Sequence, residues 1–188
     1  MNKSFSLYKP HPSHLTEAGC IVVIGMAASG KTTVGRELAQ LLGMPQMDAD
    51  NLIEATYGAP LQAVTERMSK EEFLDLESAV IRSIKVRGVV LSTGGSVVYR
   101  PDAMKYLARL GPIVHIAVPL DIVLLRIARK PERGLAIAPG QTVEDLYHER
   151  RELYEKYANL TVEGGEAPAQ DYARQIAALL SAPKEGVQ

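Results

Sequence analysis

Short apolar runs alternate along this chain with longer segments in which apolar residues recur at helical spacing. The strand-like runs are residues 20–24, 88–91, 113–118 and 160–162. The segments with helical periodicity are residues 31–42, 71–86, 101–110, 121–129, 143–158 and 169–180. Because the apolar runs are continuous and do not alternate with polar residues, we expect the sheet to be covered on both faces. The pattern therefore predicts an α/β protein with parallel strands connected by helices.

Three segments fall outside this alternation. We interpret residues 1–19 as an N-terminal arm, because they hold no apolar run of signal-peptide length, and residues 183–188 as a frayed tail. Between them we expect one domain, residues 20–182. Within it, residues 130–141 contain two prolines and two glycines among charged side chains, a composition typical of an irregular segment. We expect these residues to form a mobile lid.

Composition narrows the range of partners. The 188 residues carry 21 Lys and Arg against 22 Asp and Glu, a formal net charge of −1, so we expect no large basic surface for nucleic acid or an anionic membrane. The single cysteine, Cys20, cannot form an intramolecular disulfide, which favours a cytoplasmic protein. No uninterrupted apolar run approaches the roughly 18 residues of a membrane span. We expect a small-molecule substrate and a monomer or weak homo-oligomer.

The first predicted strand and helix flank a phosphate-binding motif. Residues 25–32 match Gly-x-x-x-x-Gly-Lys-Ser/Thr between a buried strand and a helix start, the setting in which this motif binds nucleotides. The backbone N–H groups of such a loop converge on phosphate oxygens, the lysine reaches the β- and γ-phosphates, and the hydroxyl can coordinate Mg²⁺. The residues predicted to bind ATP here are Gly25, Ala28, Ser29, Gly30, Lys31, Thr32 and Thr33.

Two acidic residues follow the next apolar segment. Asp48 and Asp50 come after residues 44–47, at what we expect to be the carboxyl end of a second strand that faces the phosphate loop. One carboxylate there is suited to hold Mg²⁺, usually through water, and the other to accept the proton of an attacking hydroxyl. An alternative role for Asp50 is to cap a helix that begins at Asn51.

These motifs, followed by three more in the same order, resemble those of the shikimate kinase family, small P-loop kinases with the fold of nucleoside monophosphate kinases. The further matches are Glu72-Phe73 with Glu77, Gly94-Gly95 after a strand, and Glu149-Arg150 with Leu153, Tyr154 and Ala158. The likeness extends over about residues 21–162. It implies a three-layer P-loop NTPase fold with a five-stranded parallel sheet between helices, ATP as phosphoryl donor, Mg²⁺, and a lid that closes over the donor.

The resemblance also implies roles for side chains on the donor side. Lys31 would be catalytic as well as phosphate-binding, and Thr32 and Asp48 would hold the metal. Arg133, in the predicted lid, matches the catalytic arginine that swings onto the transferring phosphoryl group. Arg126, seven residues earlier, is similar to the family's adenine-stacking arginine.

On the acceptor side, the resemblance implies that Asp50 orients and helps deprotonate the acceptor hydroxyl. Arg150 matches the arginine that clamps the acceptor's carboxylate, for which a planar guanidinium suits better than a lysine. Gly94, Gly95 and Glu77 belong to the same substrate-binding set.

The acceptor site departs from the family pattern at two positions. Leu74 stands where the family has a second carboxylate-binding arginine, and Ser96 stands where it has a third glycine. The missing arginine would have been one helical turn from Glu77, on the same face, and would have paired with it. An unpaired carboxylate near a pocket is costly, so we expect either that solvent reaches Glu77 or that the substrate brings a positive charge.

Three functions agree with these residues. The leading hypothesis is an ATP-dependent kinase for homoserine, which offers a carboxylate to Arg150, an ammonium group to Glu77 and a hydroxyl to Asp50. The alternative acceptor is shikimate, phosphorylated at its 3-hydroxyl, because the loss of one arginine weakens its binding without excluding it. Further alternatives are a nucleotide kinase, for which we find no aromatic base-stacking platform, and a non-catalytic ATP-binding relative.

Overall fold

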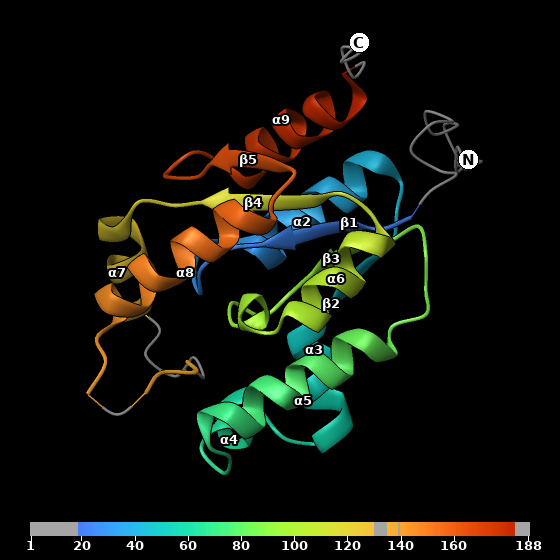
Figure 1. The fold of residues 1–188 in the computed structure, drawn as a ribbon. Coiled ribbons are helices and arrows are strands. Elements are labelled where there is room, and N and C mark those ends of the chain that lie inside the picture. The colour runs from blue at the N-terminus through green and yellow to red at the C-terminus, as the bar shows by residue number, and fades with distance from the viewer. Residues whose placement is uncertain (1–18, 130–134, 139, 183–188) are drawn as a thin grey trace, which may run out of the picture.

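Five parallel strands form one sheet in the order β2-β3-β1-β4-β5 (Figure 1). The structure is a computed structural model that describes residues 19–129, 135–138 and 140–182. The strands are β1 (Ile21–Ile24), β2 (Gln46–Asp48), β3 (Val90–Ser92), β4 (Ile113–Ala117) and β5 (Leu160–Glu163). All four strand-like runs of the sequence form strands. The fifth strand, β2, lies at the end of the apolar segment 44–47 and has Asp48 as its last residue. Because β1 lies between β3 and β4, the next two strands, β2 and β3, lie on one side of β1, and the last two, β4 and β5, lie on the other side.

Helices cover both faces of this sheet, which confirms the predicted three-layer α/β fold. In Figure 1, α6 and α8 lie in front of the sheet and α2 behind it, where α2 packs against α9. The helices are α2 (Lys31–Leu42), α3 (Ala49–Tyr57), α4 (Leu61–Thr65), α5 (Lys70–Ser83), α6 (Pro101–Leu110), α7 (Leu120–Ala128), α8 (Val143–Tyr157) and α9 (Ala169–Ser181), with a short 3₁₀ helix, η1 (Val97–Tyr99). The periodicity did not predict α4 and η1, because one turn is too short to show a period.

The central strands are buried over nearly their whole length, as their continuous apolar sequence predicts. Val22, Val23 and Ile24 of β1 have no exposed surface, and Val114 of β4 has none either. Complete burial of a side chain of this size contributes about 1.5–3 kcal/mol through the hydrophobic effect. The sheet is therefore a rigid base for the loops at its ends.

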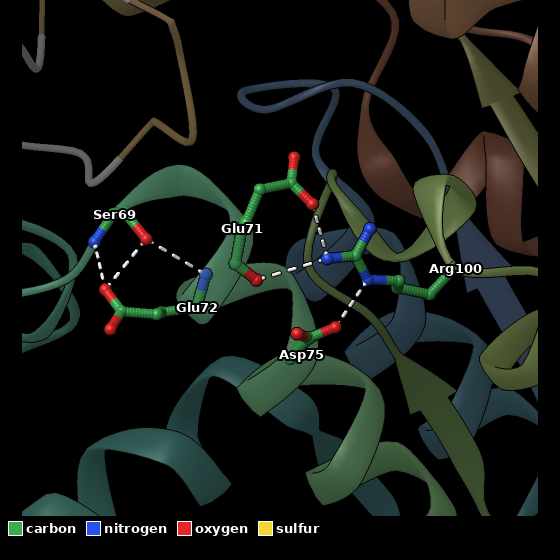
Figure 2. Close-up of polar contacts among 5 residues, drawn as sticks. All are labelled: Ser69, Glu71, Glu72, Asp75 and Arg100. Atoms are coloured by element: carbon green, nitrogen blue, oxygen red, sulfur yellow. Dashed lines mark hydrogen bonds and ion pairs between the residues drawn. The ribbon is translucent and has the colours of Figure 1, made fainter.

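Helix α5 is held at its N-terminus by two sets of polar contacts (Figure 2). Ser69 and Glu72 form a reciprocal capping box, in which each side chain accepts from the other residue's backbone N–H. Arg100, directly before α6, donates through Nη2 to Glu71 Oε2 at 2.7 Å and through Nε to Asp75 Oδ1 at 2.8 Å. These contacts fix α5 relative to α6 and to the loop after β3.

Some sequence predictions concern residues outside the described part of the chain. Residues 1–18 of the predicted arm and the tail 183–188 lie outside it, so the proposed domain limits stay predictions. Residues 130–134 and 139 of the predicted lid, which include Arg133, also lie outside it. Over the ranges that are described, no helix has the length and apolar character needed to cross a membrane.

Candidate active site

The loops that follow β1, β2 and β3 meet at the carboxyl ends of these strands. Asp48 of β2 and Val23 of β1 are both register partners of Ser92, so these three parallel strands end side by side. Because the strands point the same way, the phosphate loop after β1, the acidic residues after β2 and the Gly94-Gly95 turn after β3 are brought together. They surround a cavity of about 790 Å³.

Nearly every residue that the sequence assigned to the site lines this cavity. The lining includes Ala28, Ser29, Gly30, Lys31, Thr32, Thr33, Asp48, Asp50, Glu77, Gly94, Gly95, Arg126 and Arg150. Gly25 is not part of the lining, although its carbonyl oxygen accepts a hydrogen bond from the Lys31 ammonium group. The structure therefore joins the donor residues and the acceptor residues in a single cavity.

The phosphate loop is a strained turn that holds its lysine in place. Lys31 Nζ donates to the carbonyl oxygens of Gly25 and Met26, each at 2.9 Å. Ala28 has φ 64°, a left-handed conformation that an alanine adopts only at a free-energy cost of about 1–2 kcal/mol. A β-carbon at Gly25, with φ 148°, would lie 2.7 Å from the carbonyl oxygen of Ile116 on β4. The loop therefore needs glycine at residue 25. A turn of this kind directs backbone N–H groups inward, where they can bind phosphate oxygens.

Thr32 and Asp48 present two oxygen atoms from neighbouring elements. Thr32 Oγ1, in the first turn of α2, donates to Asp48 Oδ2 at 2.7 Å. The other oxygen, Asp48 Oδ1, accepts from the backbone N–H of Asp50 at 3.0 Å, so Asp48 is the N-cap of α3. The alternative that Asp50 caps this helix is wrong, because Asp50 lies inside its first turn. A hydroxyl and a carboxylate are ligands that fit Mg²⁺, which retains several waters in kinase sites.

Arg126 joins the two sides of the donor region. Its Nη1 donates to the carbonyl oxygen of Ala28 in the phosphate loop at 3.2 Å, and its Nη2 to that of Gly165, after β5, at 2.5 Å. Arg126 also lines the cavity, together with the phosphate loop. Its predicted contact with adenine stays a prediction.

Arg150 is a buried cation on α8. It is 1% exposed, and its guanidinium lies over the ring of Tyr99, 5.1 Å from the centroid. Nη2 donates to the carbonyl oxygen of Ala136 at 2.9 Å, and Nε to the Tyr99 hydroxyl at 3.3 Å. Among the residues described, no carboxylate forms an ion pair with it. A buried cation whose hydrogen-bond partners are neutral is a favourable place for an anionic ligand.

Glu77, on α5, lines the cavity, but it is not the fully charged carboxylate that the homoserine hypothesis requires. It is 1% exposed, and its Oε2 accepts a hydrogen bond from Ser96 Oγ at 2.7 Å. Burial and, second, the nearby charge of Asp50 raise the pKa of Glu77 to about 7. A carboxyl that is partly neutral at physiological pH is a weak determinant for an ammonium group.

Comparison with known proteins agrees with this geometry. The family model described as shikimate kinase matches residues 27–181. A shikimate kinase of Acinetobacter baumannii (strain AYE) is 33% identical over 167 residues, which cover 87% of this chain and 93% of the relative. One of Pasteurella multocida (strain Pm70) is 34% identical over 88% of this chain and 97% of its own length. Among solved structures, a shikimate kinase from Acinetobacter baumannii in complex with shikimate superposes with a TM-score of 0.84 at 30% identity, covering 93% of this chain and 99% of the other.

The fold and the site define a P-loop small-molecule kinase that uses ATP and Mg²⁺. Within that class, the chain belongs to the shikimate kinase family. The leading hypothesis of a homoserine kinase is therefore wrong. The relatives support the alternative acceptor, and burial, by raising the pKa of Glu77 to about 7, weakens the negative charge on which the hypothesis depended. The kinase relatives likewise favour an enzyme over a non-catalytic ATP-binding protein.

Three further residues contact the predicted acceptor-side residues, and none of them had a role predicted from sequence. Ser96 donates to Glu77, Tyr99 supports Arg150, and the hydroxyl of Tyr154 donates to the Gly95 carbonyl oxygen at 2.5 Å. Tyr154 also stacks on His115 of β4, with ring centroids 5.0 Å apart. Ser96 was visible as a departure from the family pattern and Tyr154 as part of a matched motif, whereas Tyr99 acts through a contact with a residue distant in sequence.

Proposed function

We propose that this protein transfers the γ-phosphoryl group of ATP to the 3-hydroxyl group of shikimate. The observation that carries the proposal is the buried Arg150 guanidinium, which shares one cavity with the phosphate loop and Asp50. Shikimate has a carboxylate for Arg150 and hydroxyl groups for Asp50. A solved relative with a TM-score of 0.84 is described as a complex with this compound.

In this mechanism the chain's own residues divide into a donor set and an acceptor set. Lys31, fixed by two backbone carbonyl oxygens, is placed to stabilise the negative charge of the phosphoryl group in transfer. Asp50 accepts a hydrogen bond from the attacking hydroxyl and takes up its proton. Arg150 holds the acceptor's carboxylate, so that the hydroxyl is oriented toward the donor.

Thr32 and Asp48 would hold Mg²⁺, whose chemistry in this site is to neutralise charge on the donor's phosphate oxygens. The hydrogen bond from Asp50 N–H and the position of Asp48 at the end of β2 fix the carboxylate before any ligand arrives. The catalytic role predicted for Arg133 concerns a residue outside the described ranges and stays a proposal from the family resemblance.

Leu74 gives no help in binding the acceptor's carboxylate. It is 2% exposed and is absent from the cavity lining. Arg150 is then the arginine that remains for this anion on the described acceptor side, and an ordinary charge-assisted hydrogen bond contributes about 1.5–3 kcal/mol. We therefore expect shikimate to bind more weakly here than in a relative with two arginines.

The test is an ADP-release assay with ATP, Mg²⁺ and shikimate, with the product identified by mass spectrometry and NMR. We expect shikimate phosphorylated at its 3-hydroxyl. The matched control is shikimate methyl ester, which keeps the hydroxyls and removes the carboxylate, and we expect its kcat/KM to be at least tenfold lower. Absence of phosphorylated product with shikimate at millimolar concentration would overturn the proposal.

A further inference from the structure

The carboxyl group of Glu77 has one satisfied oxygen and one unsatisfied oxygen. Oε2 accepts the hydrogen bond from Ser96 Oγ at 2.7 Å, whereas Oε1 is buried and has no hydrogen-bond partner. No lysine or arginine of the described ranges forms an ion pair with this residue. A buried acceptor without a partner costs about 1–3 kcal/mol, and more when it is charged. A proton on Oε1 removes the part of that cost that comes from the buried charge, and it makes this oxygen a hydrogen-bond donor.

The unsatisfied oxygen lies beside the catalytic carboxylate. A β-carbon built on Gly94 would be 2.0 Å from Glu77 Oε1 and 2.9 Å from Asp50 Oδ1, so both oxygens converge on this glycine. Asp50, Glu77, Gly94 and Ser96 all line the cavity. An anionic acceptor that enters the cavity must therefore approach two carboxyl groups at once.

Charged and titratable groups face Glu77 from several elements. Asp50 comes from α3, Lys31 from α2, and Arg150 and Tyr154 from α8, while the Ser96 hydroxyl comes from the turn before η1. Burial and the charge of Asp50 raise the pKa of Glu77 to about 7, and Ser96, Arg150 and Lys31 act in the opposite direction. The neighbouring groups thus hold the carboxyl between its two protonation states near neutral pH.

We propose that Ser96 and Glu77 form a proton-carrying element of the acceptor site, in which Glu77 takes up one proton on Oε1 when the anionic acceptor binds and Ser96 sets the pH at which this occurs. The inference rests on the proposed function for its acceptor. The negative charge of a bound carboxylate favours the neutral form of Glu77, and proton uptake follows by linkage. Acceptor affinity then decreases as pH rises, because the ionised carboxyl repels the acceptor.

The role of Ser96 has a definite sign. Its hydroxyl donates to Oε2 and stabilises the ionised form of Glu77. Without this hydrogen bond, Glu77 keeps its proton to higher pH, and the decline in acceptor affinity moves in the same direction. A serine with a purely structural role would change stability or kcat and leave the pH of the decline unchanged.

The experiment is calorimetric binding of shikimate to the full chain between pH 6 and 9, in buffers of different ionisation enthalpy. For the unmodified protein we expect a Kd that rises severalfold between pH 6.5 and 8.5, by at most tenfold per pH unit, with net proton uptake near neutral pH. Glu77→Gln should show no proton uptake and a flat profile. Ser96→Ala should move the rise in Kd to higher pH, whereas the control Ser78→Ala, at a buried serine whose hydroxyl does not donate to the Glu77 carboxyl, should leave it in place. Uptake that persists in Glu77→Gln, or a profile that Ser96→Ala does not move, would overturn the inference.

A second measurement separates this inference from the proposed function. NMR titration of the free protein labelled with ¹³C at the glutamate carboxyl groups follows Glu77 without any acceptor. We expect a carboxyl resonance that titrates near pH 7, that is missing in Glu77→Gln and that shifts to higher pH in Ser96→Ala. If shikimate is neither bound nor phosphorylated, the proposed function is wrong. The titration of the Glu77 carboxyl near pH 7 in the free protein can be observed even in that case. A Glu77 resonance that titrates in the ordinary acidic range overturns the inference whatever the acceptor is.

Discussion

Asp48 uses its two carboxylate oxygens for two different elements: one accepts from the hydroxyl of Thr32 at 2.7 Å, and the other from the backbone N–H of Asp50 at 3.0 Å. The first contact faces the phosphate loop, and the second starts α3. Because a different oxygen makes each contact, the proposed metal binding and the helix cap can be separated by mutation.

Asp48→Asn should reduce activity about 10²-fold or more and raise the Mg²⁺ concentration needed for half-maximal rate. Asparagine caps a helix about as well as aspartate, so thermal stability should change by less than about 1 kcal/mol. Steady-state kinetics against Mg²⁺ and thermal unfolding test the two parts. Asp48→Ala is the control, because it removes the cap as well and should lower both activity and stability. Normal Mg²⁺ dependence in Asp48→Asn would contradict the assignment of the metal site.

Asp50→Asn should be nearly inactive, by roughly 10²–10⁴-fold in kcat, because the amide cannot take up the proton of the acceptor hydroxyl. The helix cap is supplied by Asp48, so the melting temperature should stay within a few degrees of the unmodified protein. Quantifying kcat together with the affinity for ATP tests this prediction. An active Asp50→Asn enzyme would show that another group receives the proton.

Arg150→Lys should raise KM for shikimate about tenfold or more and change KM for ATP little. Lysine keeps the positive charge but loses the planar fork that contacts Tyr99 and the Ala136 carbonyl oxygen. The matched control is Arg151→Lys, one residue later on the same helix, where the side chain is exposed and pairs with Glu155. Equal effects of the two substitutions would argue against an anion site at Arg150.

Gly94→Ala should abolish acceptor binding while ATP still binds, because the added methyl group would overlap Glu77 Oε1 and crowd Asp50. Gly165→Ala, on the donor side of the same cavity, is the control. Its added β-carbon would meet the Tyr172 hydroxyl at 3.6 Å, an ordinary contact. Calorimetric titration with each substrate separates the two effects. Tight acceptor binding by Gly94→Ala would show that the Glu77 side chain can move to accommodate the added methyl group.

The stability of the protein should depend on His115 in the acidic range. His115 is 4% exposed, and burial lowers its pKa to about 4 from 6.5. Above pH 6.5, His115 is mostly neutral in both the folded and the unfolded protein, so the free energy of unfolding is not reduced. As the pH falls toward 4, the unfolded protein binds a proton at this residue that the folded protein does not, and the free energy of unfolding decreases by on the order of 3 kcal/mol in total. Urea unfolding between pH 4 and 7.5 should show a smaller loss in His115→Phe, whose ring can still stack on Tyr154. The raised pKa of Glu77 changes the free energy of unfolding in the opposite direction between about pH 4.5 and 7. This effect is present in both proteins, so the difference between them isolates the contribution of His115.

The local features of this fold were open to prediction from sequence because their causes lie within a few residues. The continuous apolar runs became buried strands, and the phosphate loop lies between β1 and α2, where its motif requires it. Element limits were less predictable. The helix expected over residues 71–86 ends at Ser83, since Ile84 already has an extended backbone with ψ 117°.

Homoserine was the wrong acceptor because an amino-acid sequence shows which side chains can carry charge but not which of them are buried. From sequence, Glu77 was a carboxylate that had lost its arginine, and a cationic ligand was the natural partner to expect. In the folded protein, Ser96, nineteen residues later, donates to that carboxylate, and burial raises its pKa. No spacing rule predicts this contact, because the loop after β3 and helix α5 meet only through the packing of the sheet.

The amino-acid sequence by itself determined the class of this protein: the phosphate loop, the Asp48 and Asp50 pair and the order of strands and helices are properties of contiguous residues. Only the tertiary structure decided which polar groups face one another and how much water reaches them. Those two quantities set the free energy of each charge, and so they decide that Arg150 is a buried cation with neutral hydrogen-bond partners and that Glu77 is a buried carboxyl with a raised pKa.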